Sequence, residues 1–256
     1  MKKTLFLVYG LMAYAIFVST FCYAVGFVSS LIVPKHIDSV PRSPLTYALL
    51  VNTGVLTLFA LQHSIMARPA FKRWWTKFVP EPVERSTYVL LASVCLLFLF
   101  EYWQPIGIVV WKVDSQPYRL LLKILSLSGF GIVLVTTFLI NHFDLFGLRQ
   151  VWFYFLGRPY VSPPFKTPLF YQHVRHPLYL GFIIAFWATP TMTAAHLFFA
   201  IATTAYMLAA IQFEERDLVK QFGAKYHEYK RSAPMLIPFT GMTRRKRKAD
   251  HAEIAN

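Results

Sequence analysis

The sequence predicts an all-α protein that crosses a membrane several times, a polytopic bundle of five or six helical spans. Three observations predict this fold class. Hydrophobic residues make up 56% of the 256 residues and charged residues only 15%, against about 45–50% and about 25% in a soluble domain. The apolar residues gather in runs as long as the ~20 residues that a spanning helix needs. The basic residues, which give a formal charge of +14, fall in short segments between those runs.

Four segments are long and apolar enough to span a membrane, namely 5–33, 44–66, 86–103 and 118–141. The first begins like a signal peptide, but its apolar run continues without a small-residue cleavage site, so we interpret it as a retained span. A fifth apolar region, 177–213, is too long for one helix and is interrupted around Pro190. We expect a helical hairpin there, whose first arm reaches only about 20 Å.

Lysine and arginine placement predicts the orientation. These residues cluster near the N-terminus, in the loops 67–85 and 142–176, and in the C-terminal tail, whereas the alternate loops 34–43 and 104–117 are poorer in them. Basic loops remain in the cytoplasm, so we expect a multi-pass protein of a bacterial inner membrane with both termini cytoplasmic. The hairpin then enters and leaves on one side, which brings "RHP" (175–177) close to "FEERDL" (213–218).

We expect one integral membrane domain over residues 1–240. It comprises four N-terminal spans in 1–141, a cytoplasmic loop at 142–176 for a cofactor, and a hairpin with a cytoplasmic helix in 177–240. Residues 241–256, which contain "RRKRK", form a basic tail for which we expect disorder.

The last part of this domain, 214–239, predicts an amphipathic cytoplasmic helix that ends at Pro234 and Pro238. Tyr226 and Tyr229 on this helix either close over a pocket or pack against the membrane surface.

The remaining composition excludes several other classes. No recognition module accompanies the basic clusters, so we expect membrane lipid and not nucleic acid as their partner. Cys22 and Cys95 lie in apolar runs without a CxxC pair, which indicates two small buried side chains. Pro177 interrupts any helical pairing of His173 with His176, so we expect no metal site.

"RHPLYLG" (175–181) combines features of an anion site at the membrane surface. Pro177 suits the first turn of a helix, where free N–H groups and the helix dipole attract anions, and Arg175 adds a positive charge. Tyr179 follows within a turn, and Gly181 lies on the same face as Pro177, where it lets a ligand or a second helix approach. The alternative is that Arg175, His176 and Tyr179 only anchor the helix at the interface.

Glu214 and Glu215 follow directly after the second arm of the predicted hairpin. Two adjacent carboxylates beside an apolar run are unfavourable in lipid, and a helix C-terminus disfavours them further. A nearby cation would stabilise them, either Arg175, Arg216 or the ammonium group of a ligand. A ligand with both a carboxylate and an ammonium group would satisfy both ends of the hairpin.

These motifs carry a resemblance to known proteins. "TPLFYQHVRHPLYLG" (167–181), followed by a hairpin and by "EERDL" and "FGAKYHEYK", resembles the C-terminal half of the isoprenylcysteine carboxyl methyltransferases and phospholipid methyltransferases. "LVYGLMAYAIFVSTFCYAVGF" (7–27), "LQHSIMARPAFKRWW" (61–75) and "INHFDLFGLRQVW" (140–152) resemble the methanethiol S-methyltransferases of the nurim family, so that the resemblance covers nearly the whole chain. It implies a membrane enzyme that uses S-adenosylmethionine to methylate a small thiol, methanethiol, to dimethyl sulfide.

The resemblance also implies which positions contact the adenosyl ligand. They are Thr167, Tyr171, His176, Pro177, Tyr179 and Glu214, with Lys166 as a secondary candidate. The residue chemistry above adds Arg175, Gly181 and Glu215 to this predicted cofactor site.

Three positions depart from the carboxyl methyltransferase pattern. A histidine is replaced by Pro163, a glycine by Leu169, and the arginine that holds a substrate carboxylate by Ala210. The first two leave details of the adenosine pocket open. The third argues against a carboxylate acceptor and favours a small neutral one.

Thiol methylation needs a base or a cationic field, because a thiol with a pKa near or above about 8.5 is mostly protonated at neutral pH. The candidates are His142 and Asp144 in "NHFD", where the fourth span meets the loop, and His173. The alternative for His142 and Asp144 is that they only cap the helix end. His63 in "LQHS" is a further candidate, and would otherwise hydrogen-bond inside the bundle.

Two other functions remain open from the sequence. One is a related membrane methyltransferase that acts on another thiol, on isoprenylcysteine or on a lipid amine. The other is a non-enzymatic membrane protein like nurim. The oligomeric state is open as well.

Overall fold

The computed structural model describes residues 1–238 and residue 240, so the predicted basic tail at 241–256 lies outside the described residues. Five helices are long and apolar enough to cross a membrane. They are α1 (Lys2–Ser29), α2 (Leu45–Met66), α4 (Glu81–Tyr102), α5 (Gln116–Ile140) and α10 (Ala194–Phe222). This confirms the predicted all-α membrane bundle, and the first four lie close to the four predicted N-terminal spans.

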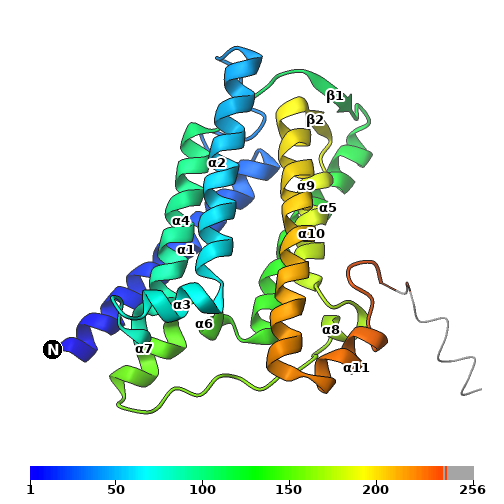
Figure 1. The fold of residues 1–256 in the computed structure, drawn as a ribbon. Coiled ribbons are helices and arrows are strands. Elements are labelled where there is room, and N and C mark those ends of the chain that lie inside the picture. The colour runs from blue at the N-terminus through cyan, green and yellow to red at the C-terminus, as the bar shows by residue number, and fades with distance from the viewer. Residues whose placement is uncertain (239, 241–256) are drawn as a thin grey trace, which may run out of the picture.

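Short helices gather at one end of the bundle, which we call the α11 end and which is lowest in Figure 1. They are α3 (Pro69–Trp75), α6 (His142–Leu145), α7 (Leu148–Phe155), α8 (Phe170–His173) and α11 (Ala224–Ser232). At the opposite end, the β end, β1 (Val109–Lys112) pairs antiparallel with β2 (Thr191–Thr193). This small sheet was not among the elements predicted from the sequence.

The predicted hairpin is present with unequal arms. Its first arm is α9 (Pro177–Trp187), whose 11 residues span only about 16 Å, short of the ~30 Å apolar core of a bilayer. Beyond α9 the chain continues through Pro190 to β2 at the β end, and α10 then returns to the α11 end (Figure 1). Residues 1–238 therefore contain five long apolar helices and one short arm that is completed by extended chain.

The amphipathic helix predicted at 214–239 has the wrong bounds. Residues 214–222 belong to α10, and α11 is a separate helix that follows Gly223, whose φ is 55°. Hydrophobic contacts hold α10 in one helix past the expected membrane boundary. Glu214 and Glu215 therefore lie inside α10 and not at its C-terminus, so the expected dipole penalty does not apply to them.

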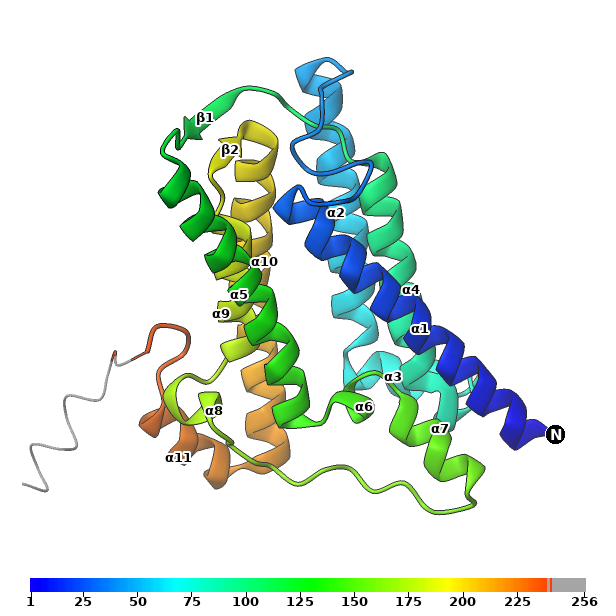
Figure 2. The same cartoon turned by 180° about the vertical axis from the view of Figure 1, so that it is seen from behind.

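The helices form two groups that stand apart in both views (Figures 1 and 2). One group contains α1, α2, α4 and α7, and the other contains α5, α9 and α10. Within the second group, α5 and α9 meet at Gly129 and Gly181. A Cβ on Gly181 would lie 2.7 Å from the carbonyl oxygen of Gly129, a close approach typical of small residues in membrane helix pairs.

The two groups share a core only toward the β end. One cluster of buried side chains joins Phe27, Leu99 and Trp103 of the first group to Phe186 and Phe199 of the second. Toward the α11 end each group has a cluster of its own, around Tyr88 in the first group and around Tyr226 and Tyr229 in the second. The groups are therefore fastened at the β end and less closely packed at the α11 end.

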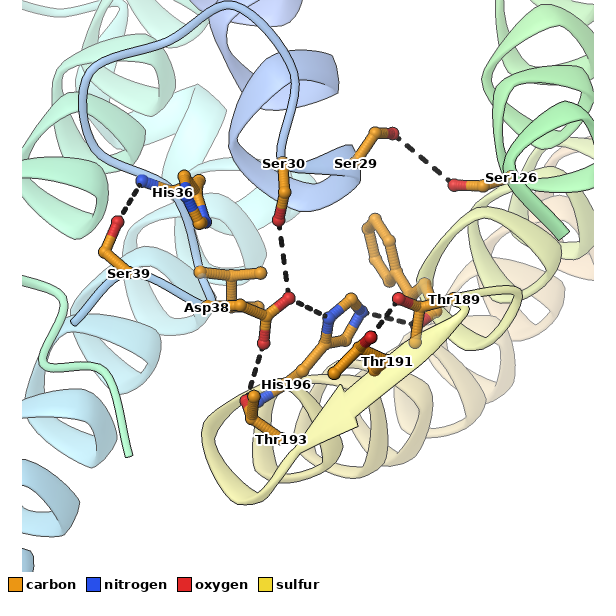
Figure 3. A network of polar contacts seen from close by, with 12 residues as sticks. Ser29, Ser30, His36, Asp38, Ser39, Ser126, Thr189, Thr191, Thr193 and His196 are labelled. Atoms are coloured by element: carbon orange, nitrogen blue, oxygen red, sulfur yellow. Dashed lines mark hydrogen bonds and ion pairs between the residues drawn. The ribbon is translucent and has the colours of Figure 1, made fainter. Parts of the chain in front are cut away.

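A buried polar network also fastens the β end, between the loop after α1 and the start of α10 (Figure 3). His196 places Nδ1 3.0 Å from Oδ2 of Asp38 and Nε2 2.9 Å from the carbonyl oxygen of Phe186. Thr193 donates its hydroxyl to Oδ1 of the same carboxylate at 2.6 Å. Because both ring nitrogens face acceptors, the network holds either an imidazolium or a protonated Asp38.

We expect His196→Ala to lower the thermal unfolding midpoint of the protein in detergent. Removing one partner of a buried pair costs about 3–5 kcal/mol, and the Asp38 side chain left behind is only 13% exposed. The measurement is a cycle of His196→Ala, Asp38→Ala and the double variant. The double variant should be no less stable than the worse single variant, because the pair is lost once. Strictly additive losses would show that the two residues do not act as a pair.

Candidate active site

A buried carboxylate at the α11 end gathers three basic side chains. Glu215 of α10 accepts from Nε of Arg175 at 2.7 Å and from Nε2 of His176 at 3.1 Å through Oε1, and lies 2.7 Å from Nζ of Lys230 through Oε2. Its side chain is 6% exposed. The predicted proximity of "RHP" to "FEERDL" is therefore found, as the topology required. We call these four residues the Glu215 clamp.

The clamp is extended by backbone bonds. The guanidinium of Arg175 also donates to the carbonyl oxygens of Lys230 and Ala233, at 3.2 and 2.6 Å. The amides of Arg175 and His176 donate to the carbonyls of Pro234 and Met235. The Arg175 side chain is thus occupied within the protein, so it positions α9 and α11 and has little capacity left for a ligand carboxylate.

Glu214, the neighbour of Glu215, points elsewhere and stays accessible. Its Oε2 accepts one hydrogen bond, from the hydroxyl of Tyr179 at 3.1 Å, and lies 3.9 Å from Nδ1 of His176. The side chain is 44% exposed. An ionised carboxylate offers about four acceptor sites, so Glu214 keeps capacity for an external donor such as an ammonium or a hydroxyl group.

An aromatic cluster from α11 covers the end of the long loop. Tyr226 and Tyr229 are buried and pack against Phe165 and Tyr171, and the hydroxyl of Tyr229 donates to the carbonyl of Tyr171 at 2.6 Å. Burial raises the pKa of Tyr171, as does the nearby Glu214. Burial likewise raises the pKa of Tyr226 and of Tyr229. These phenols therefore stay neutral and can donate hydrogen bonds at physiological pH.

The loop before Tyr171 contains two predicted cofactor residues and Leu169, one of the three departures from the carboxyl methyltransferase pattern. Thr167 is half-buried and Lys166 is exposed beside the aromatic cluster. Leu169, where the resemblance expects glycine, has a φ of 41°, a conformation that glycine adopts without strain and leucine does not. The backbone thus keeps the shape that the family's glycine would give it.

Two other predicted cofactor residues have structural partners. Gly181 faces Gly129 of α5, so it serves the approach of a second helix, one of the two roles predicted for it. Pro177 is buried at the first turn of α9, as its sequence position predicts.

The three predicted bases lie in different surroundings. His142 is buried, with Nδ1 2.8 Å from the hydroxyl of Thr137 and Nε2 2.8 Å from that of Tyr14, and burial lowers its pKa. Asp144 accepts from Tyr160 at 2.9 Å. Each of these contacts joins two side chains, and none of them caps the backbone of a helix end.

The third predicted base, His173, ends α8. It lines an apolar pocket together with Ile132 of α5 and Leu180 of α9. This pocket lies on the α5 side of α9, whereas Tyr179 of the same helix is bound to Glu214.

Within the described part of the chain, no group of three or more His, Cys, Asp or Glu side chains is arranged to hold a metal ion. The buried acidic and basic groups at the α11 end are instead paired with one another.

Sequence reasoning missed Lys230 as a member of the clamp and Ala233 to Met235 as its backbone partners. Lys230 follows Tyr226 by four residues and so lies on the same side of α11. That spacing was readable in the sequence. The partner of Lys230 was not, because it depends on how α11 folds back at Gly223.

Comparisons with known proteins place this site in a family. The chain is 53% identical over 241 residues to a methanethiol S-methyltransferase of Crocosphaera subtropica, a match that covers 94% of each chain. It is 50% identical over 239 residues to a methanethiol S-methyltransferase of Mycobacterium tuberculosis, covering 93% of this chain and 98% of that one. The chain belongs to the methanethiol S-methyltransferase family.

More distant relatives of this methyltransferase family include nurim of Sus scrofa, 28% identical over 175 residues that cover 65% of this chain and 66% of nurim. The relatives confirm the predicted family and the predicted class of enzyme, a methyltransferase. No family model matches the chain, and no solved structure matches it.

Proposed function

We propose that this enzyme transfers a methyl group from S-adenosylmethionine to methanethiol and releases dimethyl sulfide. The observation that carries the proposal is that two adjacent glutamates have different surroundings in a chain of this family. The carboxylate of Glu215 is paired with three basic side chains. The side chain of Glu214 is 44% exposed and accepts a single hydrogen bond. An accessible carboxylate at this position suits the ammonium or ribose hydroxyl groups of the donor.

The residues around Glu214 fit the rest of the donor. Tyr171 and Tyr179 supply aromatic faces and neutral hydroxyls next to this carboxylate. Thr167 and Lys166 lie at the end of the same loop, and an exposed lysine is suited to a ligand carboxylate. When bound, the donor supplies an activated methyl group on a sulfonium.

The space available for the acceptor is set by α10. Tyr206, Ala210 and Glu214 follow one another at intervals of four residues and so lie along one side of this helix. Ala210 is half-buried and stands where the carboxyl methyltransferase pattern has an arginine. A small apolar side chain here leaves room for a small neutral thiol and offers no partner to a carboxylate.

The protein's own contribution is positioning and exclusion of water. The Glu215 clamp fixes the start of α9 against α10, and with it the relative positions of Tyr179 and Glu214. Fixed placement of two reactants lowers the barrier without any new bond to the protein. Loss of charge when a thiolate meets a sulfonium is favoured by an apolar surrounding.

We also propose that the α11 end faces the cytoplasm of a bacterial cell. The N-terminus, the loop 67–85 and the loop 142–176 all lie at this end (Figure 1), and basic segments of this kind remain cytoplasmic. A soluble charged donor can then reach Glu214 from the cytoplasm.

The test is a headspace assay of purified protein with S-adenosylmethionine and a series of thiols. We expect dimethyl sulfide from methanethiol, and a specificity constant that falls as the alkyl chain grows. Heat-treated protein is the control. The proposal fails if methanethiol yields no dimethyl sulfide, and a preference for long-chain thiols or lipid amines would identify the related methyltransferase instead.

A further inference from the structure

A second polar cluster lies between the two helix groups, apart from the Glu215 clamp. The hydroxyl of Tyr88 on α4 is 3.0 Å from both ring nitrogens of His63 on α2. The adjacent Ser64 places its hydroxyl 3.0 Å from that of Tyr206 on α10. Side chains from both groups thus meet on this side of α2.

This cluster meets α10 on the side that carries the donor site. Tyr206, which contacts Ser64, lies on the same side of α10 as Glu214, two steps of four residues earlier, and Ala210 lies between them. Glu214 in turn accepts from the hydroxyl of Tyr179. The His63 cluster therefore borders the side of α10 where Ala210 leaves room for an acceptor.

A salt bridge holds α2 at this level of α10. Arg68, just after α2, is 2.9 Å from Asp217, three residues beyond Glu214. His63, a little more than one helical turn before Arg68, is thereby kept at a fixed depth beside α10.

The imidazole of His63 is enclosed by aromatic rings but not sealed. It stacks on Phe59 with ring centroids 5.3 Å apart and an interplanar angle of 26°. Its residue surface is half-buried, whereas Tyr88 behind it is 6% exposed. The half-buried surface of His63 therefore leaves part of the residue open to contact with a molecule as small as methanethiol.

One cation lies beside the cluster and forms no ion pair with a carboxylate of the described residues. The guanidinium carbon of Arg85 on α4 is 4.9 Å from the centroid of the Tyr88 ring. Arg68 is paired with Asp217, and Lys72 lies 3.1 Å from Glu84 of α4. A cation near the acceptor stabilises a thiolate as it forms.

We propose that His63 is the base that accepts the proton of the acceptor thiol; this inference rests on the proposed function. The S–H bond of the thiol breaks and its proton passes to a ring nitrogen of His63. The sulfur electron pair forms the new bond to the methyl carbon, and the electrons of the broken carbon–sulfur bond stay with the donor's sulfur. The proton on His63 then leaves to water, so that atoms and charge balance.

The contrast with His142 supports this choice. Both ring nitrogens of His142 are held at 2.8 Å by hydroxyl groups, and its ring stacks on Phe138 at 4.1 Å. A histidine bound on both sides in this way has no nitrogen directed at a substrate. His63, in contrast, shares one phenol between its two nitrogens, so one nitrogen stays available for a thiol.

The test is the pH dependence of the rate for His63→Gln, a variant of similar size. At pH 7 we expect kcat/KM for methanethiol to fall about 10²- to 10⁴-fold, the usual contribution of a general base. The loss should shrink as the pH rises, because the thiol then ionises without help. A variant profile that runs parallel to the wild-type profile at all pH values would overturn the inference.

Three controls separate this result from a failed fold or a wrong function. Binding of S-adenosylmethionine and the thermal midpoint should be unchanged in His63→Gln. His227→Gln, on the exposed side of α11, should keep the wild-type profile. If wild-type protein makes no dimethyl sulfide, the proposed function fails; if it does and His63→Gln equals it, only the His63 inference fails.

Chemical modification of His63 provides a second measurement that does not depend on enzyme activity. Acylation of His63 by diethyl pyrocarbonate, followed by mass spectrometry, should slow when dimethyl sulfide occupies the acceptor space. Acylation of His227 should not change. Equal acylation of His63 with and without dimethyl sulfide would overturn its placement beside the acceptor.

Discussion

Glu214→Gln is expected to weaken the binding of S-adenosylmethionine strongly while the protein remains folded. The carboxylate is 44% exposed and accepts one hydrogen bond from Tyr179, so the fold depends little on its charge. A charged donor on the ligand depends on it strongly, and losing one partner of such a pair costs about 2–5 kcal/mol, or roughly 30- to 4,000-fold in affinity. Isothermal titration in detergent measures the affinity, and a thermal scan measures stability.

The matched control is Glu228→Gln, which removes the charge of an exposed glutamate on α11. It should bind the donor as wild type does. Wild-type affinity in Glu214→Gln would show that the accessible carboxylate is not part of the donor site.

Glu215→Ala is expected to unfold the α11 end, the opposite outcome for the adjacent residue. The substitution leaves Arg175, His176 and Lys230 without their shared partner. Removing one member of a buried ion pair costs about 3–5 kcal/mol because the remaining charge is uncompensated. Thermal unfolding in detergent should show the loss, and hydrogen exchange should show increased exchange of the amides of α11.

Variants of two of the basic residues, Arg175 and Lys230, should differ in stability according to how buried each side chain is. Arg175→Ala should be nearly as harmful as Glu215→Ala, because the guanidinium is 11% exposed and also holds two carbonyls. Lys230→Ala should cost less, because its side chain is 36% exposed and water can replace the lysine. A Lys230→Ala variant less stable than Arg175→Ala would contradict the assigned order.

Much of the site was accessible to sequence reasoning because topology alone brings its parts together. A hairpin that enters and leaves on one side must place "RHP" beside "EE", whatever the details of packing. Roles within that site were less accessible. Arg175 was expected either to serve a ligand anion or to pair with the glutamates. It pairs with Glu215 of α10, and it also donates to two carbonyls, of Lys230 and Ala233, that only the fold of α11 brings to it.

The ends of the helices were also predicted only in part from the sequence. The polar run after Phe213 predicted a new helix at 214, but α10 continues to Phe222. Local polarity signals where water begins, whereas helix continuity is decided by contacts with Phe165 and Tyr226 that form after the chain turns at Gly223. The network of Asp38 and His196 has no local signal at all, since 158 positions separate its two members.

By itself, the sequence determined the membrane bundle, the hairpin and the family, and it predicted that the two ends of the hairpin lie together. These follow from runs of apolar residues, from the spacing of a few motifs and from the placement of basic loops, all of which are local. Only the tertiary structure decided which glutamate is buried and which is open, and which side chains surround each histidine. The physical reason is that a carboxylate or an imidazole acquires its role from partners supplied by other helices, and those partners exist only once the helices have packed.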